Sequence, residues 1–160
     1  MPALARRATT APIVARAADP AFLAFVVGLG VIVAAASVQG LADGVRAVLP
    51  DGDALPSLLL IAAVAAVLAN AINNIPATLV LVPVLAPGGP ALVLAALIGL
   101  DVGPNLTYTG SLATLLWRRV LRHDRHDVAA ATFVRVGAAV VPAAVAVATT
   151  ALWVSDRLWG

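Results

Sequence analysis

Long apolar stretches alternate with short polar segments along this chain. Four apolar stretches dominate the pattern, at residues 20–42, 55–86, 91–117 and 128–154. A helix needs about 20 apolar residues to cross a hydrocarbon core of about 30 Å. The pattern therefore predicts an all-α integral membrane protein in which the polar segments are connections between helices.

The second stretch, 55–86, is too long for one ordinary span and too short for two. Its centre reads ANAINNIPAT at residues 69–78, with three asparagines, a proline and a threonine between apolar flanks. Polar breaks at membrane depth are tolerated only where protein buries them or where they line a wet cavity. We predict a re-entrant helical hairpin with these residues at its tip. The alternative is a kinked, buried helix whose asparagines bond to neighbouring helices.

The distribution of arginine supports a re-entrant hairpin. Arginines gather before Pro20 and in the segment RRVLRHDRHD at 118–127. Arginine-rich connections stay on the cytoplasmic side, and both can do so only if 55–86 enters the membrane and returns to the same side. The predicted order in the cell (plasma) membrane is a cytoplasmic lead-in 1–19, a span 20–42, the hairpin 55–86, a broken span 91–117, a cytoplasmic loop 118–127 and a span 128–154.

The third stretch, 91–117, contains a second interruption, GLDVGPNLTYTGS at residues 99–111. Gly103 and Pro104 break a helix, and the residues that follow supply uncharged hydrogen-bonding groups. Asp101 is the one carboxylate in this stretch. An ionisable group at membrane depth predicts proton or cation coupling, with helix capping near the interface as the alternative. A pair of interrupted segments is typical of discontinuous-helix transporters.

Composition agrees with a membrane protein and excludes several classes of site. The 160 residues are 62% hydrophobic and 11% charged, whereas a soluble domain averages about 25% charged residues. The chain has no cysteine, which excludes disulfides and thiolate metal sites. The basic residues flank apolar stretches instead of forming a basic face, so we expect no nucleic-acid partner.

Enzymatic chemistry finds no support in the sequence. No nucleophile–base pair or phosphate-binding loop is present in a polar segment, so we expect a protein that is not an enzyme. A group of imidazoles and carboxylates lies among the arginines of 118–127, where a solvated turn is the better interpretation than a metal site. We expect no cofactor and no metal. The group consists of His123, Asp124, His126 and Asp127.

Two segments, NAINNIPATLVLVPVL at 70–85 and GLDVGPNLTYTGSLATLLWRRVLR at 99–122, resemble the C-terminal half of the arsenite/antimonite efflux permeases. These permeases belong to an ion-transporter superfamily that also contains divalent-anion/sodium symporters. The segment GPNLTYTGSLATLLW at 103–117 is the most specific part. The resemblance implies the second of two inverted repeats and export of As(OH)₃ and Sb(OH)₃, driven by proton exchange or by an arsenite-stimulated ATPase partner.

The same resemblance assigns a substrate site to the hairpin tip and the broken helix, with Asp101 as the proton carrier. Amides and hydroxyls can replace the hydration shell of an uncharged solute with three hydroxyls. For Thr107, Thr109 and Ser111, bonding to nearby helix carbonyls is the alternative. The expected substrate-binding residues are Asn70, Asn73, Asn74, Pro76, Thr78, Asn105, Thr107, Thr109 and Ser111, and the expected helix-break residues are Gly99, Gly103, Pro104 and Gly110.

The resembled family has two repeats, and this chain carries the second. We therefore expect a separately encoded N-terminal half or an intact permease as partner, besides membrane lipid and a small inorganic solute. Two other functions stay open: an anion or dicarboxylate permease with proton or sodium coupling, and a truncated remnant or assembly subunit that does not transport. Neither polar break contains an arginine, which favours a neutral substrate over an anion.

Overall fold

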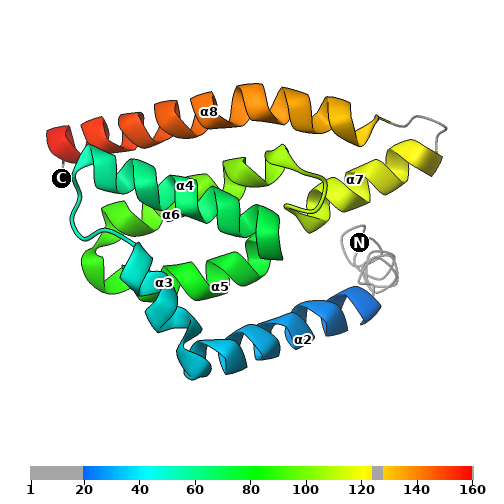
Figure 1. Cartoon of the computed structure of the whole chain (residues 1–160), viewed down its shortest axis with the longest axis horizontal. Helices are drawn as coiled ribbons and strands as arrows, with labels where there is room; N and C mark the ends of the chain where they lie inside the picture. Colours follow the sequence, from blue (N-terminus) through cyan, green and yellow to red (C-terminus); the bar gives the residue numbers. More distant parts are fainter. Residues whose placement is uncertain (1–19, 124–127, 160) are drawn as a thin grey trace, which may run out of the picture.

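The computed structural model describes residues 20–123 and 128–159, and every regular element in these residues is helical. The predicted lead-in 1–19 lies outside the described residues. In chain order the elements are α2 (Pro20–Ala36), the π-helical turn η1 (Ser37–Leu41), α3 (Ala42–Val48), α4 (Leu55–Ile72), α5 (Asn74–Leu85), the 3₁₀ turn η2 (Ala86–Gly88), α6 (Pro90–Val102), the 3₁₀ turn η3 (Gly103–Leu106), α7 (Leu112–His123) and α8 (Ala130–Trp159) (Figure 1).

The prediction of an all-helical protein with membrane-spanning candidates is confirmed. By length and composition, α4 and α8 can each cross a membrane. The region of α2 and α3 becomes a third candidate if its two helices, bent by 44°, count as one span. The bend falls at Gly40, whose φ of 96° is outside the helical region. The first predicted span is therefore not one straight helix.

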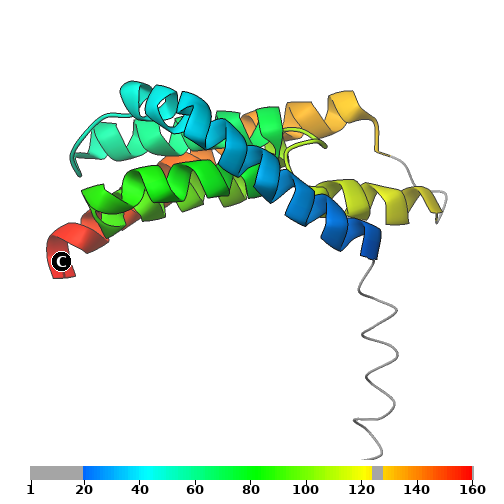
Figure 2. The same cartoon turned by 90° about the horizontal axis from the view of Figure 1, so that it is seen from below.

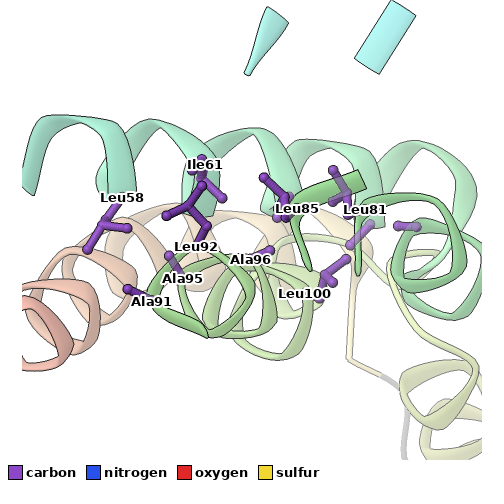
Figure 3. Packing of buried hydrophobic residues seen from close by; sticks show 12 residues of the cluster. Leu58, Ile61, Leu81, Leu85, Ala91, Leu92, Ala95, Ala96 and Leu100 are labelled. Carbon is purple, nitrogen blue, oxygen red and sulfur yellow. The ribbon is translucent and has the colours of Figure 1, made fainter. Parts of the chain in front are cut away.

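The core of the molecule lies between α4, α5 and α6 (Figure 3). Leu58 and Ile61 of α4, Leu81 of α5 and Leu100 of α6 are almost completely buried there. Alanines fill much of the remaining contact surface, which lets the helix backbones approach one another closely. The other buried members of the cluster are Ala65, Ala69, Ala77, Leu85, Ala91, Leu92, Ala95 and Ala96.

Two glycines bring α6 into backbone contact with α4. A Cβ atom at Gly99 would overlap the carbonyl oxygen of Ala62, and one at Gly103 would lie 2.5 Å from Ala66 Cα. The sequence suggested that the helix breaks from Gly99 onward, but α6 continues through it to Val102. Gly99 serves close packing, and the interruption begins at Gly103.

The helices α4 and α5 form a hairpin, with the segment before α4 close to the end of α5. Arg46 of α3, just before α4, donates from Nη1 to the Val84 carbonyl near the end of α5 at 2.8 Å. Asn73 joins the two helices with a φ of 80°, a left-handed conformation that asparagine tolerates better than most residues. At 18 and 12 residues, α4 and α5 are about 27 Å and 18 Å long.

The remaining helices border this hairpin. In Figures 1 and 2, α2 and α8 lie on different sides of the central helices, with α2 beside α5 and α8 along α4 and α6. Helix α7 continues to His123, so the first part of the predicted loop 118–127 is helical. Its alternation of apolar residues and arginine suits an amphipathic helix. Residues 124–127, with most of the candidate metal group, lie outside the described residues.

Candidate functional site

The two polar breaks predicted from the sequence meet in the structure. One is the hairpin tip, residues 70–74, where α4 turns into α5. The other consists of η3 and of residues 107–110, which lead from η3 to α7. Residues 107–110 are called the strap. The Asn74 N–H donates to the Gly110 carbonyl at 3.1 Å, and the Asn73 side-chain amide donates to the Thr109 carbonyl at 3.2 Å. Tip and strap are therefore bonded directly to each other.

Asn70 is the main link between them. Its Nδ2 donates to the carbonyls of Ala66 and Gly103, both at 2.8 Å. Its Oδ1 accepts a hydrogen bond from the Thr107 hydroxyl at 2.8 Å. Both amide hydrogens are used, so Asn70 holds the site together more than it offers groups to a solute.

The hydroxyls of Thr107 and Thr109 lie 3.1 Å apart on the strap. Because the Thr107 hydrogen goes to Asn70, Thr109 must donate to Thr107. The Thr109 oxygen then keeps lone pairs for accepting a bond from a solute, and its side chain is exposed. Within residues 20–123 and 128–159, neither threonine bonds back to a helix carbonyl, which was the alternative expectation for them.

The beginning of α5 has few donors left for a ligand. Its first residues donate to the strap or to Asn73: Asn74 N–H to the Gly110 carbonyl, Ile75 N–H to Asn73 Oδ1 at 3.5 Å, and Ala77 N–H to the Asn73 carbonyl. Pro76 has no N–H and is buried. The half-buried side chain of Asn74 has no hydrogen-bond partner among the described residues, and its amide can serve a solute.

Three further predicted site residues make local bonds. The Thr78 hydroxyl donates to the Asn74 carbonyl at 2.7 Å, and Asn105 donates to the Val102 carbonyl at 3.0 Å from an exposed position. Ser111 is buried and caps α7, because its Oγ accepts from the Thr114 N–H at 3.1 Å. Thr78 thus bonds back to a helix carbonyl, whereas Ser111, for which such a bond was the alternative expectation, caps the start of α7 instead.

Gly110 allows the tip and strap to come together. A Cβ atom there would lie 2.6 Å from Pro104 Cα and 2.8 Å from Asn70 Oδ1. Gly103 and Pro104 are both buried in η3. The predicted break residues 103, 104 and 110 thus lie at the point of closest contact, where a side chain at 110 would separate the two breaks.

Asp101 lies near the end of α6, two residues before η3, and is exposed. It has no hydrogen bond or ion pair with any residue that the structure describes. Within the same residues, no group of three or more histidine or acidic side chains could hold a metal ion.

Tyr108 is the site neighbour that sequence reasoning missed. It lies between the two strap threonines, yet its side chain is only 6% exposed. Its ring stacks on Phe133 of α8. The sequence signal was the position itself, since an aromatic residue among small polar ones needs an apolar contact.

Comparison with known proteins identifies the family. Residues 3–155 match the family of arsenical pump membrane proteins, ArsB. The chain belongs to this family. Two curated relatives, the arsenical pump membrane proteins of Escherichia coli (strain K12) and Shigella flexneri, are each 33% identical to the chain over 135 residues, which is 78% of this chain and 31% of each relative. No solved structure shows a significant match.

Membership confirms the family predicted from the residues, and together with the apolar helices it assigns the chain to a membrane. The ArsB family is one of membrane pumps and not of classical enzymes. The chain spans less than a third of the length of the two relatives.

Proposed function

We propose that this ArsB-family chain carries half of a transport path for arsenite and antimonite, as As(OH)₃ and Sb(OH)₃. The observation that carries the proposal is the docking of hairpin tip and strap, which gathers uncharged hydrogen-bonding groups where two helices are interrupted. Discontinuous helices of this kind form transport sites at the membrane midplane. Amide and hydroxyl contacts hold a solute weakly enough to release it.

The hydrogen-bond pattern supports a neutral solute over an anion. An anion at a helix start is bound by unpaired N–H groups, whereas the donors at the start of α5 are already used. The Thr109 oxygen, in contrast, can accept a bond from a hydroxylated solute, and the Asn74 amide can donate or accept. A hydroxylated neutral metalloid fits this set better than the anion or dicarboxylate that we considered from the sequence.

We propose that α4 and α5 form a re-entrant hairpin within the second inverted repeat of the ion-transporter fold. The contact from Arg46 to Val84 supports this arrangement, because the segments before and after the hairpin lie at the same end of the molecule. Asp51 and Gly88 also line one small hollow there. The tip would then lie inside the membrane, with α6, the strap and α7 as the broken span.

The site also favours a partner. Thr109 and Asn105 are exposed, so this chain alone does not enclose a solute. We propose that a separately encoded first repeat, or an intact permease, covers this open side, with Asp101 carrying the coupled proton. An arsenite-stimulated ATPase is a further proposed partner of the assembled pump.

Arsenite accumulation in cells that lack their own arsenite pump tests this function. The chain is expressed alone and together with the reading frames next to its gene, and cellular arsenic is measured after exposure. We expect lower accumulation in at least one combination. Unchanged accumulation in every combination, with the protein detected in the membrane, would reject the metalloid assignment and favour a chain that does not transport.

A matched pair of variants tests whether a loss of export comes from the proposed site or from a general disturbance of the fold. Asn74→Ala removes an amide that has no partner among the described residues. Thr150→Ala removes an exposed hydroxyl of α8 whose one bond within the same residues goes to the Ala146 carbonyl. We expect export to fall with Asn74→Ala and to stay unchanged with Thr150→Ala. Equal export by both variants would exclude Asn74 from the transport path.

A further inference from the structure

We propose that Tyr108 is a positioning residue that sets the strap hydroxyls over the hairpin tip and connects them to the start of α8. This inference rests on the proposed transport function, because it concerns the geometry of the same site. Neither the family match nor the predicted site residues include this role. Tyr108 itself is buried and does not face the solute.

The strap backbone places Tyr108 opposite the site threonines. Residues 107–110 form a tight turn, closed by the bond from the Gly110 N–H to the Thr107 carbonyl at 3.3 Å. The hydroxyls of Thr107 and Thr109 meet on one side of this turn, 3.1 Å apart. Tyr108 points the other way, toward α7 and α8.

Three contacts hold the Tyr108 ring in place. It stacks on Phe133 of α8 with the ring centroids 4.2 Å apart and the planes at 22°. The guanidinium carbon of Arg118 on α7 lies 4.2 Å from the ring centroid. The phenol donates to the Val128 carbonyl, just before α8, at 2.9 Å. Tyr108 thus joins the strap to both α7 and α8.

On the side of the strap that faces the hairpin tip, close contacts leave little room for the strap backbone to shift. Thr107 bonds to Asn70, and Gly110 packs so closely against Pro104 that even a methyl group would not fit. Between these two points the strap has one internal backbone hydrogen bond, from the Gly110 N–H to the Thr107 carbonyl at 3.3 Å. Movement of Phe133 or of the start of α8 would therefore be transmitted through Tyr108 to the threonines.

Substitutions at both ends of the stack test the proposal. Tyr108→Leu removes the stacked ring, Phe133→Leu removes its partner, and Tyr108→Phe keeps the stack but loses the bond to Val128. Trp159→Leu, which removes an exposed aromatic side chain at the far end of α8, is the control. Arsenite uptake into everted membrane vesicles, prepared from cells that express the chain in the combination that exports arsenite, gives KM and Vmax, normalised to the amount of protein in the membrane.

We expect Tyr108→Leu and Phe133→Leu each to raise KM about 3- to 10-fold, as the loss of one aromatic pair implies. Tyr108→Phe should recover most of the affinity, and Trp159→Leu should match the parent protein. A lower protein amount with unchanged KM in both leucine variants would show a merely structural role and overturn the proposal. Phe133→Leu decides the question if Tyr108→Leu does not reach the membrane.

A second readout works without transport. The chain has no cysteine, so Thr109→Cys introduces one thiol, whose reaction rate with a maleimide reports on the position of the strap. We expect Tyr108→Leu to change this rate about 3-fold or more, while Trp159→Leu leaves it unchanged. If the parent protein moves no arsenite with any of the neighbouring reading frames, the transport proposal fails and this rate alone decides: an unchanged rate overturns the role of Tyr108, and a changed rate supports it.

Discussion

The Thr107 hydroxyl donates a hydrogen bond to Asn70 Oδ1 at 2.8 Å, across 37 positions of the chain. The bond joins the end of α4 to the strap between α6 and α7. Asn70 also binds the Gly103 carbonyl, so one amide holds both sides of the helix interruption. The following predictions start from this connection.

Replacing Asn70 should destabilise the fold. Asn70→Ala loses three hydrogen bonds and leaves the carbonyl of buried Gly103 without its described partner, which should cost about 2–3 kcal/mol of unfolding free energy. Asn105→Ala is the matched control, because that amide is exposed and, among the residues that the structure describes, bonds only to the Val102 carbonyl; its cost should stay below about 1 kcal/mol. Thermal unfolding in detergent measures both. Equal midpoints for the two variants would contradict the central role of Asn70.

A methyl group at Gly110 should separate the strap from the tip. Gly110→Ala places Cβ 2.8 Å from Asn70 Oδ1 of the tip and 2.6 Å from Pro104 Cα, and relieving such an overlap costs about 1–3 kcal/mol. We expect lower stability and loss of arsenite export. Gly44→Ala, on α3 with nothing within 4 Å of its Cβ, should be neutral or slightly stabilising. Full export by Gly110→Ala would show that tip and strap need not touch.

Asp101→Asn should abolish the coupling of export to the proton gradient without changing the stability of the fold. The carboxylate is exposed and without a described partner, so its replacement should change stability by less than about 0.5 kcal/mol. If Asp101 carries the proton, export by the variant should no longer respond to an imposed pH gradient, as measured in everted vesicles. Export that still follows the gradient at the parent rate would exclude this residue as the carrier.

The re-entrant hairpin predicts which loops share a membrane face. Single cysteines at Asp51 and Pro87, both exposed, should react with an impermeant thiol reagent from the same side. A cysteine at His123, at the end of α7, should react from the opposite side, because the broken span lies between. Labelling of 51 and 87 from different sides would mean that α4 and α5 together cross the membrane once, and the hairpin would be rejected.

Much of this architecture is readable from the sequence because apolar length and polar interruption are local properties. The stretches 55–86 and 91–117 indicated helices broken at an Asn-Pro segment and at a Gly-Pro segment, and both breaks exist. The exact residues at which the helices break were harder to predict from the sequence. Gly99 was expected to belong to the break, but its missing side chain serves contact with Ala62, and no local pattern distinguishes these two uses of glycine.

The sequence by itself determined the membrane class, the family and the residue types available to the site, since hydrophobic length and motif spacing are carried by neighbouring residues. Only the tertiary structure decided how those residues are used. It committed Asn70 to holding the strap, left the Asn74 amide without a described partner and recruited Tyr108 as an anchor. These assignments depend on backbone carbonyls and rings that are far apart along the chain, and such contacts form only when the helices pack.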